Sequence, residues 1–291
     1  MTAREPMFVE LESGVELSIE LWGSSDTDLT PWVLTHGLAS NKHLWDGVAA
    51  HLAHRGHPVV TVDQRGHGQS SKPDSGYDMV SCANDLALLI EQLAVIGGIV
   101  KPAVAGQSWG GNVVLEMARQ HNNAASVICC VDGGFIELRS RFPHWADAEQ
   151  ALAPPALLGT PVAQIEQWVE SMASDWPSEG RAGTMANFEV RSDGTIAPWL
   201  TLERHLMVLR GLWEHDPYDS MPQVETPTLI VAAEDDNPTW PKAEPVARAL
   251  ELLPTARAEW FRPAHHDVHA QKPAEVAELL HSAVTAADFF S

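Results

Sequence analysis

The segment Gly-Gln-Ser-Trp-Gly at residues 106–110 is the part of the sequence whose residue types point most directly to chemistry. A serine between two glycines at this spacing can sit on a tight turn from a strand into a helix, with its hydroxyl exposed. The apolar run 103–105 before it is typical of a strand, and the residues from Gly111 onward are typical of a helix. We therefore predict Ser108 as a nucleophile, which needs a base to take its proton.

The chain has 14 histidines, so position rather than number must single out the base. His266 lies between the last expected strand, residues 258–261, and the final expected helix. A base at that place would lie on a loop at the carboxyl edge of the sheet, on the same side as Ser108. We predict His266 as the general base, with His265 and His269 as alternatives on the same loop.

The histidine needs a carboxylate that fixes its tautomer and stabilises the imidazolium. The expected strand 228–232 runs into a short acidic stretch, from which a carboxylate could reach a histidine on the next loop. We predict Asp236 as this acid, with Asp235 as a close alternative. Asp132, after the preceding strand, is the remaining alternative, although we expect it to order the glycine turn that it opens.

Acyl transfer also needs donors for the negative charge that develops on the carbonyl oxygen. The backbone N–H of Trp109, which follows the nucleophile, is one expected donor, and the backbone N–H of Leu38 is the other. Leu38 follows Gly37, which would let the main chain approach the substrate oxygen. We expect His36 to be a structural loop residue and not a second base.

Composition limits the class of protein. The 291 residues carry 18 Lys+Arg against 39 Asp+Glu, a formal net charge of −21. That balance argues against a nucleic-acid partner, which needs clustered Lys and Arg, and it disfavours anionic membranes and, more weakly, strongly anionic substrates. The share of hydrophobic residues, 45%, is typical of a globular chain that buries a core without disulfides or metals.

No metal and no cofactor is expected. The three cysteines, Cys82, Cys129 and Cys130, lack both disulfide-framework and zinc-ligand spacing, so we expect them to be small buried residues. The histidine-rich stretch 265–269 is expected to supply the base rather than metal ligands. The first residues lack the apolar core of a signal peptide, and no stretch approaches 18 apolar residues, so we expect a cytoplasmic protein without membrane insertion.

The elements that must position these residues alternate between strands and helices. Continuous apolar runs typical of strands buried on both faces are residues 32–35, 59–62, 103–105, 127–131 and 228–232. Helix-like stretches separate most of these runs, so the pattern predicts a parallel α/β sheet. An antiparallel hairpin is expected from 8–12 and 15–21. Residues 135–222 break the alternation with tryptophans and prolines, and we expect a helical insertion there, with a small hairpin at 189–196.

A resemblance to one superfamily is carried by Thr-His-Gly at 35–37, Asp-Gln-Arg-Gly-His-Gly-Gln-Ser at 63–70, Gly-Gln-Ser-Trp-Gly-Gly at 106–111, Asp236 and the segment 266–273. The chain resembles the α/β-hydrolase superfamily, in its cap-bearing, serine esterase-like branch, over nearly its whole length. The resemblance implies an α/β-hydrolase fold: a mostly parallel eight-stranded sheet with helices on both faces and a helical cap insertion. The implied division is a core at 1–135, a cap at 136–220 and a second core part at 221–291. It also implies a structural role for Asp63 and Arg65.

Serine at position 108 argues against dehalogenases and epoxide hydrolases of this superfamily, which have an aspartate there. We expect a serine hydrolase that cleaves a small or medium neutral carboxylic ester or lactone through an acyl-enzyme, with a small molecule as its only expected partner. A carbon–carbon bond hydrolase or a haloperoxidase- or perhydrolase-type enzyme on the same triad is the alternative. There are two lesser alternatives. One is a proline iminopeptidase-like enzyme, because the tryptophan after the expected nucleophile, Trp109, resembles the corresponding turn of those enzymes, and the other is a non-enzymatic ligand-binding protein.

Overall fold

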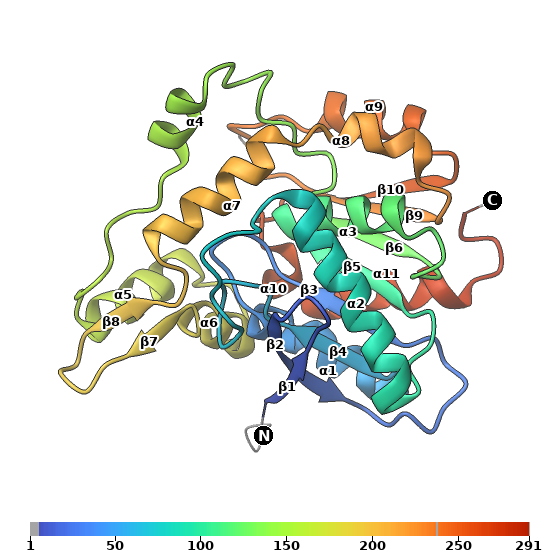
Figure 1. Ribbon diagram of the computed structural model, residues 1–291, viewed down its shortest axis with the longest axis horizontal. Coiled ribbons are helices and arrows are strands. Elements are labelled where there is room, and N and C mark those ends of the chain that lie inside the picture. Colours follow the sequence, from blue (N-terminus) through green and yellow to red (C-terminus); the bar gives the residue numbers. More distant parts are fainter. Residues whose placement is uncertain (1–5, 237, 291) are drawn as a thin grey trace.

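One eight-stranded sheet forms the centre of the molecule. The computed structural model describes residues 6–236 and 238–290, and Figure 1 shows the elements along the chain. The strand order is β1-β2-β4-β3-β5-β6-β9-β10. The strands are β1 (Met7–Glu10), β2 (Glu16–Trp22), β3 (Trp32–Thr35), β4 (Val59–Val62), β5 (Ala103–Gln107), β6 (Ile128–Val131), β9 (Thr228–Ala233) and β10 (Ala256–Phe261).

The sheet is parallel from β4 to β10. Strand β2 pairs antiparallel with both β1 and β4, and the remaining neighbours pair in parallel. The predicted N-terminal hairpin and the predicted mostly parallel eight-stranded sheet are thus confirmed. The central strands are buried on both faces, which explains why they read as unbroken apolar runs rather than as alternating patterns.

Helices cover both faces of the sheet, as expected. Successive residues of a strand point to opposite faces. Val33 and Val104 accordingly pack with α2 and α3, whereas Leu34 and Ala105 pack with α1 and α11. Figure 1 shows these two helical layers on opposite sides of the strands. The helices of the two layers are α1 (Asp46–His54), α2 (Met79–Gly97), α3 (Trp109–Gln120), α9 (Ala243–Leu252), α10 (Val268–Gln271) and α11 (Pro273–Thr285).

Helix α2 differs from one expectation. It is long and apolar enough, by length and composition, to cross a membrane, although no such stretch was expected. Half of its apolar window is buried inside the molecule. Leu86, Leu89 and Leu93 of this helix belong to the main core cluster, together with residues of α3. We therefore assign α2 as a core helix that covers one face of the sheet.

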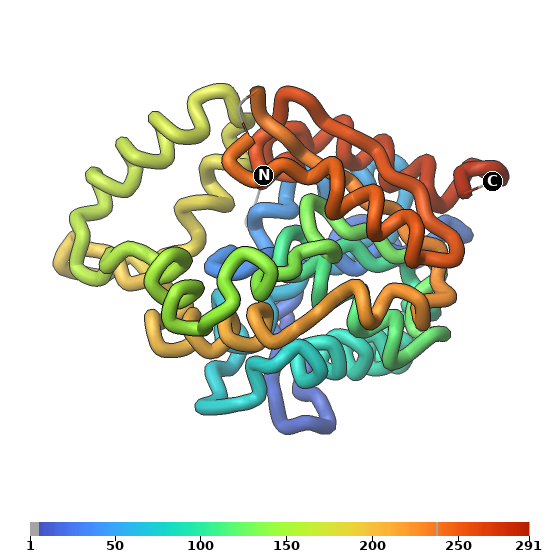
Figure 2. The backbone as a smooth tube through the Cα atoms, turned by 90° about the horizontal axis from the view of Figure 1, so that it is seen from above, coloured from blue at the N-terminus to red at the C-terminus, as the bar shows by residue number. Residues whose placement is uncertain are grey.

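The chain between β6 and β9 contains the elements that break the alternation. They are α4 (Trp145–Leu152), α5 (Val162–Met172), α6 (Ser178–Met185), β7 (Phe188–Val190), β8 (Ile196–Pro198), α7 (Leu202–Glu214), α8 (Pro217–Ser220) and the 3-10 helix η2 (Met221–Gln223). The antiparallel pairing of β7 with β8 confirms the predicted hairpin. Seen from above in Figure 2, much of this yellow-green segment extends to one side of the sheet. A second 3-10 helix, η1 (Lys42–Trp45), precedes α1.

Candidate active site

Ser108 lies on the turn between β5 and α3. Its backbone has φ 54° and ψ −124°, a conformation that side-chain-bearing residues rarely adopt and that projects the residue from a sharp strand-to-helix turn. A Cβ at Gly106 would collide with the carbonyl oxygen of Gly110, and one at Gly133 would collide with that of Ser108. The glycines around Ser108 are therefore required by close main-chain packing, as the sequence indicated.

Ser108 lines a cavity of about 520 Å³, which we call the serine cavity. The loops after β3, β5 and β10 contribute Leu38, Ser108 and His266 to its wall. These strands are parallel, so their carboxyl ends meet at one edge of the sheet, where α/β proteins usually place their ligands. Trp109 also lines the cavity, so both expected oxyanion donors and the expected nucleophile and base share one space.

The partner of His266 is Asp132. Nδ1 of His266 lies 2.5 Å from Oδ2 of Asp132, whose side chain is fully buried. The second oxygen, Oδ1, accepts the backbone N–H of Ala233 at 2.9 Å. Burial alone would lower the pKa of His266, but the hydrogen bond and the charge of Asp132 raise it overall. Burial likewise favours the neutral acid at Asp132, yet the hydrogen bond from His266 and the charges of His266 and Lys242 hold its pKa below the usual range.

The expected pairing of His266 with Asp236 is therefore corrected. Asp236 and its alternative Asp235 are exposed on the loop after β9, and the carboxylate at Nδ1 of His266 comes from the end of β6. Strand β6 lies between β5 and β9, so Asp132 follows the strand next to that of Ser108. The signal in the sequence was Asp132 itself, a single carboxylate directly after a buried apolar strand, which the run of three acidic residues after β9 outweighed.

Lys242 is a residue of the site that sequence reasoning missed. Its Nζ lies 2.5 Å from Oδ2 of Asp132, and it also donates to the carbonyl oxygen of Ala233. It lines the serine cavity and is 18% exposed. Nothing in its sequence context marks it, because it precedes α9 in a loop of ordinary composition and reaches Asp132 only through the fold.

His36 is a structural residue, in agreement with its expected role. Its ring is buried, with Nδ1 2.8 Å from the carbonyl oxygen of Gly37 and Nε2 accepting the backbone N–H of Gln64 at 3.0 Å. Burial lowers its pKa. Both ring nitrogens are occupied, so the ring connects the loop after β3 to the loop after β4 and is not placed to take a proton from Ser108.

Asp63 and Arg65 also serve the fold. Asp63 accepts the backbone N–H of Lys42 and its ammonium group, each at 2.8 Å, and the side chains of both residues are buried. Nε and Nη2 of Arg65 donate to the two carboxylate oxygens of Asp85 at 2.5 and 2.6 Å. These pairs anchor the loop after β4 to η1 and to α2.

The two alternative histidines on the loop after β10 have other surroundings. His265, which is exposed to much the same extent as His266 (41% against 46%), lies edge-on against Trp176, with ring centroids 5.0 Å apart. His269 is fully buried against Trp45, and burial lowers its pKa to about 4. His266 is the member of this group that lines the serine cavity and pairs with a carboxylate there.

The three cysteines are buried, as expected. Burial raises the pKa of the Cys130 thiol to about 12, and it raises those of Cys82 and Cys129 as well. These thiols are therefore protonated at neutral pH and pack as small apolar groups.

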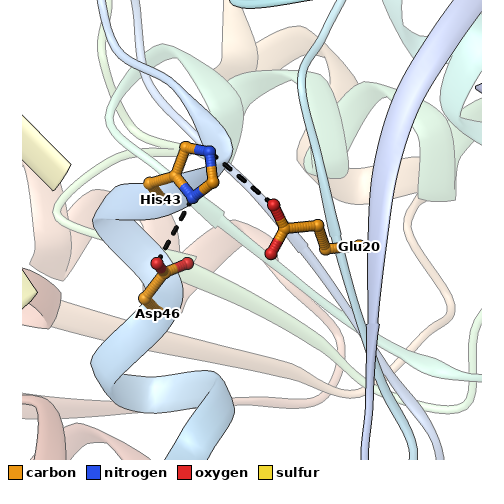
Figure 3. A group of neighbouring side chains, drawn as sticks. All are labelled: Glu20, His43 and Asp46. Atoms are coloured by element: carbon orange, nitrogen blue, oxygen red, sulfur yellow. Dashed lines mark hydrogen bonds and ion pairs between the residues drawn. The ribbon is translucent and has the colours of Figure 1, made fainter. Parts of the chain in front are cut away.

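A separate group of potential metal ligands lies away from the serine cavity. Figure 3 shows Glu20, His43 and Asp46, whose ligand atoms lie within 4.8 Å of one another. Nδ1 of His43 faces Asp46 at 3.3 Å, and Nε2 faces Glu20 at 3.7 Å. Because each carboxylate faces a different ring nitrogen, the arrangement suits a protonated imidazole held between two carboxylates better than one shared ion.

Comparison with known proteins agrees with this architecture. The sequence profile of the alpha/beta hydrolase family matches residues 32–279. A non-heme chloroperoxidase of Streptomyces lividans is 23% identical, covering 91% of this chain and 94% of its own. A bifunctional esterase/perhydrolase of Acinetobacter calcoaceticus is 26% identical, covering 79% and 82%.

A solved structure shares the whole fold. The crystal structure of E-2-(acetamidomethylene)succinate hydrolase superposes with a TM-score of 0.81 at 21% identity, covering 98% of this chain and 100% of that one. At this identity the likeness concerns the fold. The family profile covers most of the chain, including the turn at Ser108 and the loop of His266. The protein is therefore a member of the alpha/beta hydrolase family.

Proposed function

We propose that the protein is a serine hydrolase that cleaves small or medium neutral carboxylic esters or lactones through an acyl-enzyme on Ser108. One observation carries this proposal: His266 is paired with the buried carboxylate of Asp132 in the cavity that Ser108 lines. A histidine oriented in this way is what a serine hydroxyl needs in order to act as a nucleophile. The esterase and perhydrolase names of the Acinetobacter relative agree with it.

The reaction has two halves. Oγ of Ser108 attacks the carbonyl carbon while Nε2 of His266 takes its proton, and Asp132 orients the ring and stabilises the imidazolium. The backbone N–H groups of Leu38 and Trp109 stabilise the oxyanion. His266 then protonates the leaving alcohol, and the ester bond breaks. In the second half, His266 takes a proton from water, the resulting hydroxide attacks the acyl group, and the acid leaves as Ser108 regains its proton.

Within this proposal, the segment 136–220 acts as a cap over the site. Ile136, Leu152, His205 and Leu209 from this segment line the serine cavity. They supply an apolar wall opposite the sheet edge, while Ser108 comes from the core. The division into core 1–135, cap 136–220 and core 221–291, and a cytoplasmic location, belong to the same proposal.

Hydrolysis of p-nitrophenyl acetate and butyrate by wild type and Ser108→Ala tests the function. We expect kcat to fall by about 10³-fold or more in Ser108→Ala, with residual turnover from the oxyanion donors alone. A fluorophosphonate should label wild type at Ser108 and leave the variant unlabelled. Equal ester turnover by both proteins would contradict the proposed mechanism.

A second candidate is perhydrolysis on the same groups, in which hydrogen peroxide replaces water and the acyl group leaves as a peracid. The names of the chloroperoxidase and the esterase/perhydrolase relatives favour testing it. Peracid formation from an acetate ester and hydrogen peroxide should be compared with plain hydrolysis of the same ester. Fast cleavage of a diketone with slow ester turnover would instead favour the carbon–carbon bond hydrolase.

A further inference from the structure

A second, larger cavity lies beside the serine cavity. It has a volume of about 830 Å³ and is bounded by α5, by β7 and β8, and by the chain leading into α7. Prolines 154 and 155, Leu157, Ile165, Phe188 and Leu200 are among its lining residues, and we call it the apolar cavity. Among the described residues that line it, none is Asp, Glu, Lys or Arg. Either cavity is large enough to hold a drug-sized organic group.

Several large apolar side chains that line the apolar cavity are exposed to solvent, and we call the region that they surround its mouth. Leu158, Trp168 and Leu202 all line it and are 69%, 49% and 56% exposed. Contiguous exposed apolar surface is uncommon on soluble chains and marks places where an apolar ligand or partner binds. Since these side chains surround a concave space rather than a flat face, the geometry suits a small molecule.

The two cavities share a wall at His205. This residue of α7 lines both spaces and is 6% exposed. Its Nε2 is buried and has no hydrogen-bond partner within the described part of the chain, and burial lowers the pKa of the ring. A neutral ring in this shared wall puts no charge against an uncharged group, and its Nε2 can pair with a polar atom of a ligand.

The loop that carries an expected oxyanion donor also connects the two spaces. Leu38 lines the serine cavity, whereas Ala39 and Ser40, the next two residues, line the apolar cavity. Ala39 has φ 56°, in the left-handed region, so the chain turns sharply between the two walls. Oγ of Ser40 is a second buried polar atom without a partner in the described chain. The two cavities are therefore neighbours on either side of this loop.

The two cavities differ in the charged residues that line them. The serine cavity is lined by Asp132, Glu137, Glu234, Asp235 and Lys242, all of them ionisable. Among the described residues, the apolar cavity is lined by no Asp, Glu, Lys or Arg, and its titratable side chain is His205, which it shares with the serine cavity. A substrate that occupies both spaces would place its polar, reacting end at Ser108 and an uncharged end in the apolar cavity.

We propose that the apolar cavity is a second substrate subsite, and that the preferred substrate is an ester with a long alkyl or aromatic arm that passes His205. This inference rests on the proposed hydrolase function and sharpens its substrate class, from small esters to esters with an extended apolar arm. Each methylene that the arm buries contributes about fourfold to kcat/KM, from about 0.8 kcal/mol per CH₂.

Filling the apolar cavity tests the proposal. Ala156 lines the cavity and is exposed, so Ala156→Trp should occupy the space without disturbing the core. Ala163→Trp, an exposed position on α5 outside the cavity, is the matched control. The measurement is the ratio of kcat/KM for a long ester to that for p-nitrophenyl acetate. We expect Ala156→Trp to lower this ratio at least about tenfold, the loss of two methylenes, and Ala163→Trp to leave it at the wild-type value.

Two series locate the arm. In one, p-nitrophenyl octanoate extends the acyl side, and in the other, octyl acetate extends the alcohol side. A fall of the ratio in either series supports the subsite and assigns the arm to that side. Leu158→Lys places a charge at the exposed mouth and should lower the same ratio. This second variant tests the subsite independently if the Ala156→Trp protein does not fold.

The inference is overturned if the wild type shows no preference for long esters in either series. It is also overturned if both Ala156→Trp and Leu158→Lys keep the wild-type ratio. Failure of the proposed function is a separate result. If Ser108→Ala still turns over p-nitrophenyl acetate at the wild-type rate, the proposed hydrolase mechanism is wrong, whatever the chain-length ratio shows. If Ser108→Ala loses this turnover but Ala156→Trp and Leu158→Lys keep the wild-type chain-length ratio, only the subsite is wrong.

Discussion

Nζ of Lys242 lies 2.5 Å from Oδ2 of Asp132, on the oxygen that also faces Nδ1 of His266 at 2.5 Å. One carboxylate oxygen thus faces both the amino group of Lys242 and the imidazole ring of His266. The positive charge keeps Asp132 ionised in its buried place, and it lowers the pKa of His266 relative to a pair without the lysine. The lysine therefore lowers the pKa of a ring with which it has no direct contact.

Removing that charge should shift the pH dependence of catalysis. In Lys242→Met the pKa of His266 rises, so a larger fraction of the base is protonated and inactive at a given acidic pH. We expect the acid limb of kcat/KM to move to higher pH, with activity near pH 6 lowered roughly three- to tenfold, since one pKa unit is tenfold in protonation. Lys242→Arg keeps the charge and should keep the limb in place. A Lys242→Met profile that overlays the wild type would refute this role.

The identity of the acid can be tested with a pair of isosteric substitutions. Asp132→Asn removes the carboxylate at His266 and should lower kcat by about 10⁴-fold, the cost that this change has in other serine enzymes. Asp236→Asn alters an exposed carboxylate after β9 and should change kcat less than about twofold. Ester hydrolysis at saturating substrate gives both values. The reverse pattern would restore Asp236 as the acid.

Lys42 should be among the residues most sensitive to truncation. Its Nζ donates to Asp63 at 2.8 Å and to Ser18 at 3.1 Å, and it is 1% exposed. Lys42→Met leaves the carboxylate of Asp63 buried without its cation, which should lower the free energy of unfolding by about 3–5 kcal/mol. Denaturant titration measures the loss. Adding Asp63→Asn to Lys42→Met should recover part of it, and no recovery would mean that the loss came from packing alone.

His43 should make the stability of the fold depend on pH, with its contribution present at low pH and lost as pH rises. Burial lowers the pKa of His43, but Asp46, by hydrogen bond and charge, and Glu20, by charge, raise it overall above the ordinary value for histidine, about 6.5. A raised folded-state pKa stabilises the fold fully below the unfolded pKa of about 6.5, and this contribution is lost as pH rises through the folded value.

His43→Gln should therefore cost most stability below about pH 6 and progressively less at alkaline pH. Thermal or denaturant unfolding across pH 5–9 measures this difference. His54→Gln, an exposed position on α1, is the matched control and should follow the wild-type curve. A constant cost of His43→Gln at all pH values would show that its pairing does not titrate with folding.

The sequence was sufficient to predict the sheet and to place Ser108 and His266 at the same edge of it, because both depend on local patterns. Buried parallel strands read as apolar runs, and the turn at Ser108 has glycines that close packing demands. His266 follows from the expected strand order. Its ring nitrogens had to face the same sheet edge as Ser108, since both residues lie beyond the carboxyl ends of parallel strands.

The acid and its lysine could not be found in the same way. Which loop extends a carboxylate to His266 depends on how the main chain turns after β6 and β9, and Asp132 does so with φ 48°, a left-handed value that few residues other than glycine adopt. The contact between Lys242 and Asp132 spans 110 positions of sequence and has no local pattern. The apolar cavity likewise depends on tertiary packing, because Ala39 and Ser40 meet lining residues of the segment 154–205, more than 110 positions later in the chain.

Asp132 directly follows β6, and the segment 136–220 begins only four positions later. Ser108, Leu38 and Trp109 also precede that segment, so the chain encodes nearly all of its proposed bond-breaking groups before it encodes the walls that select the substrate. If the segment 136–220 is the cap that we propose, insertions and substitutions within it change what enters while the proposed reacting atoms stay in place. The short link from Asp132 to Ile136 is then the point through which a new cap would first alter the rate itself.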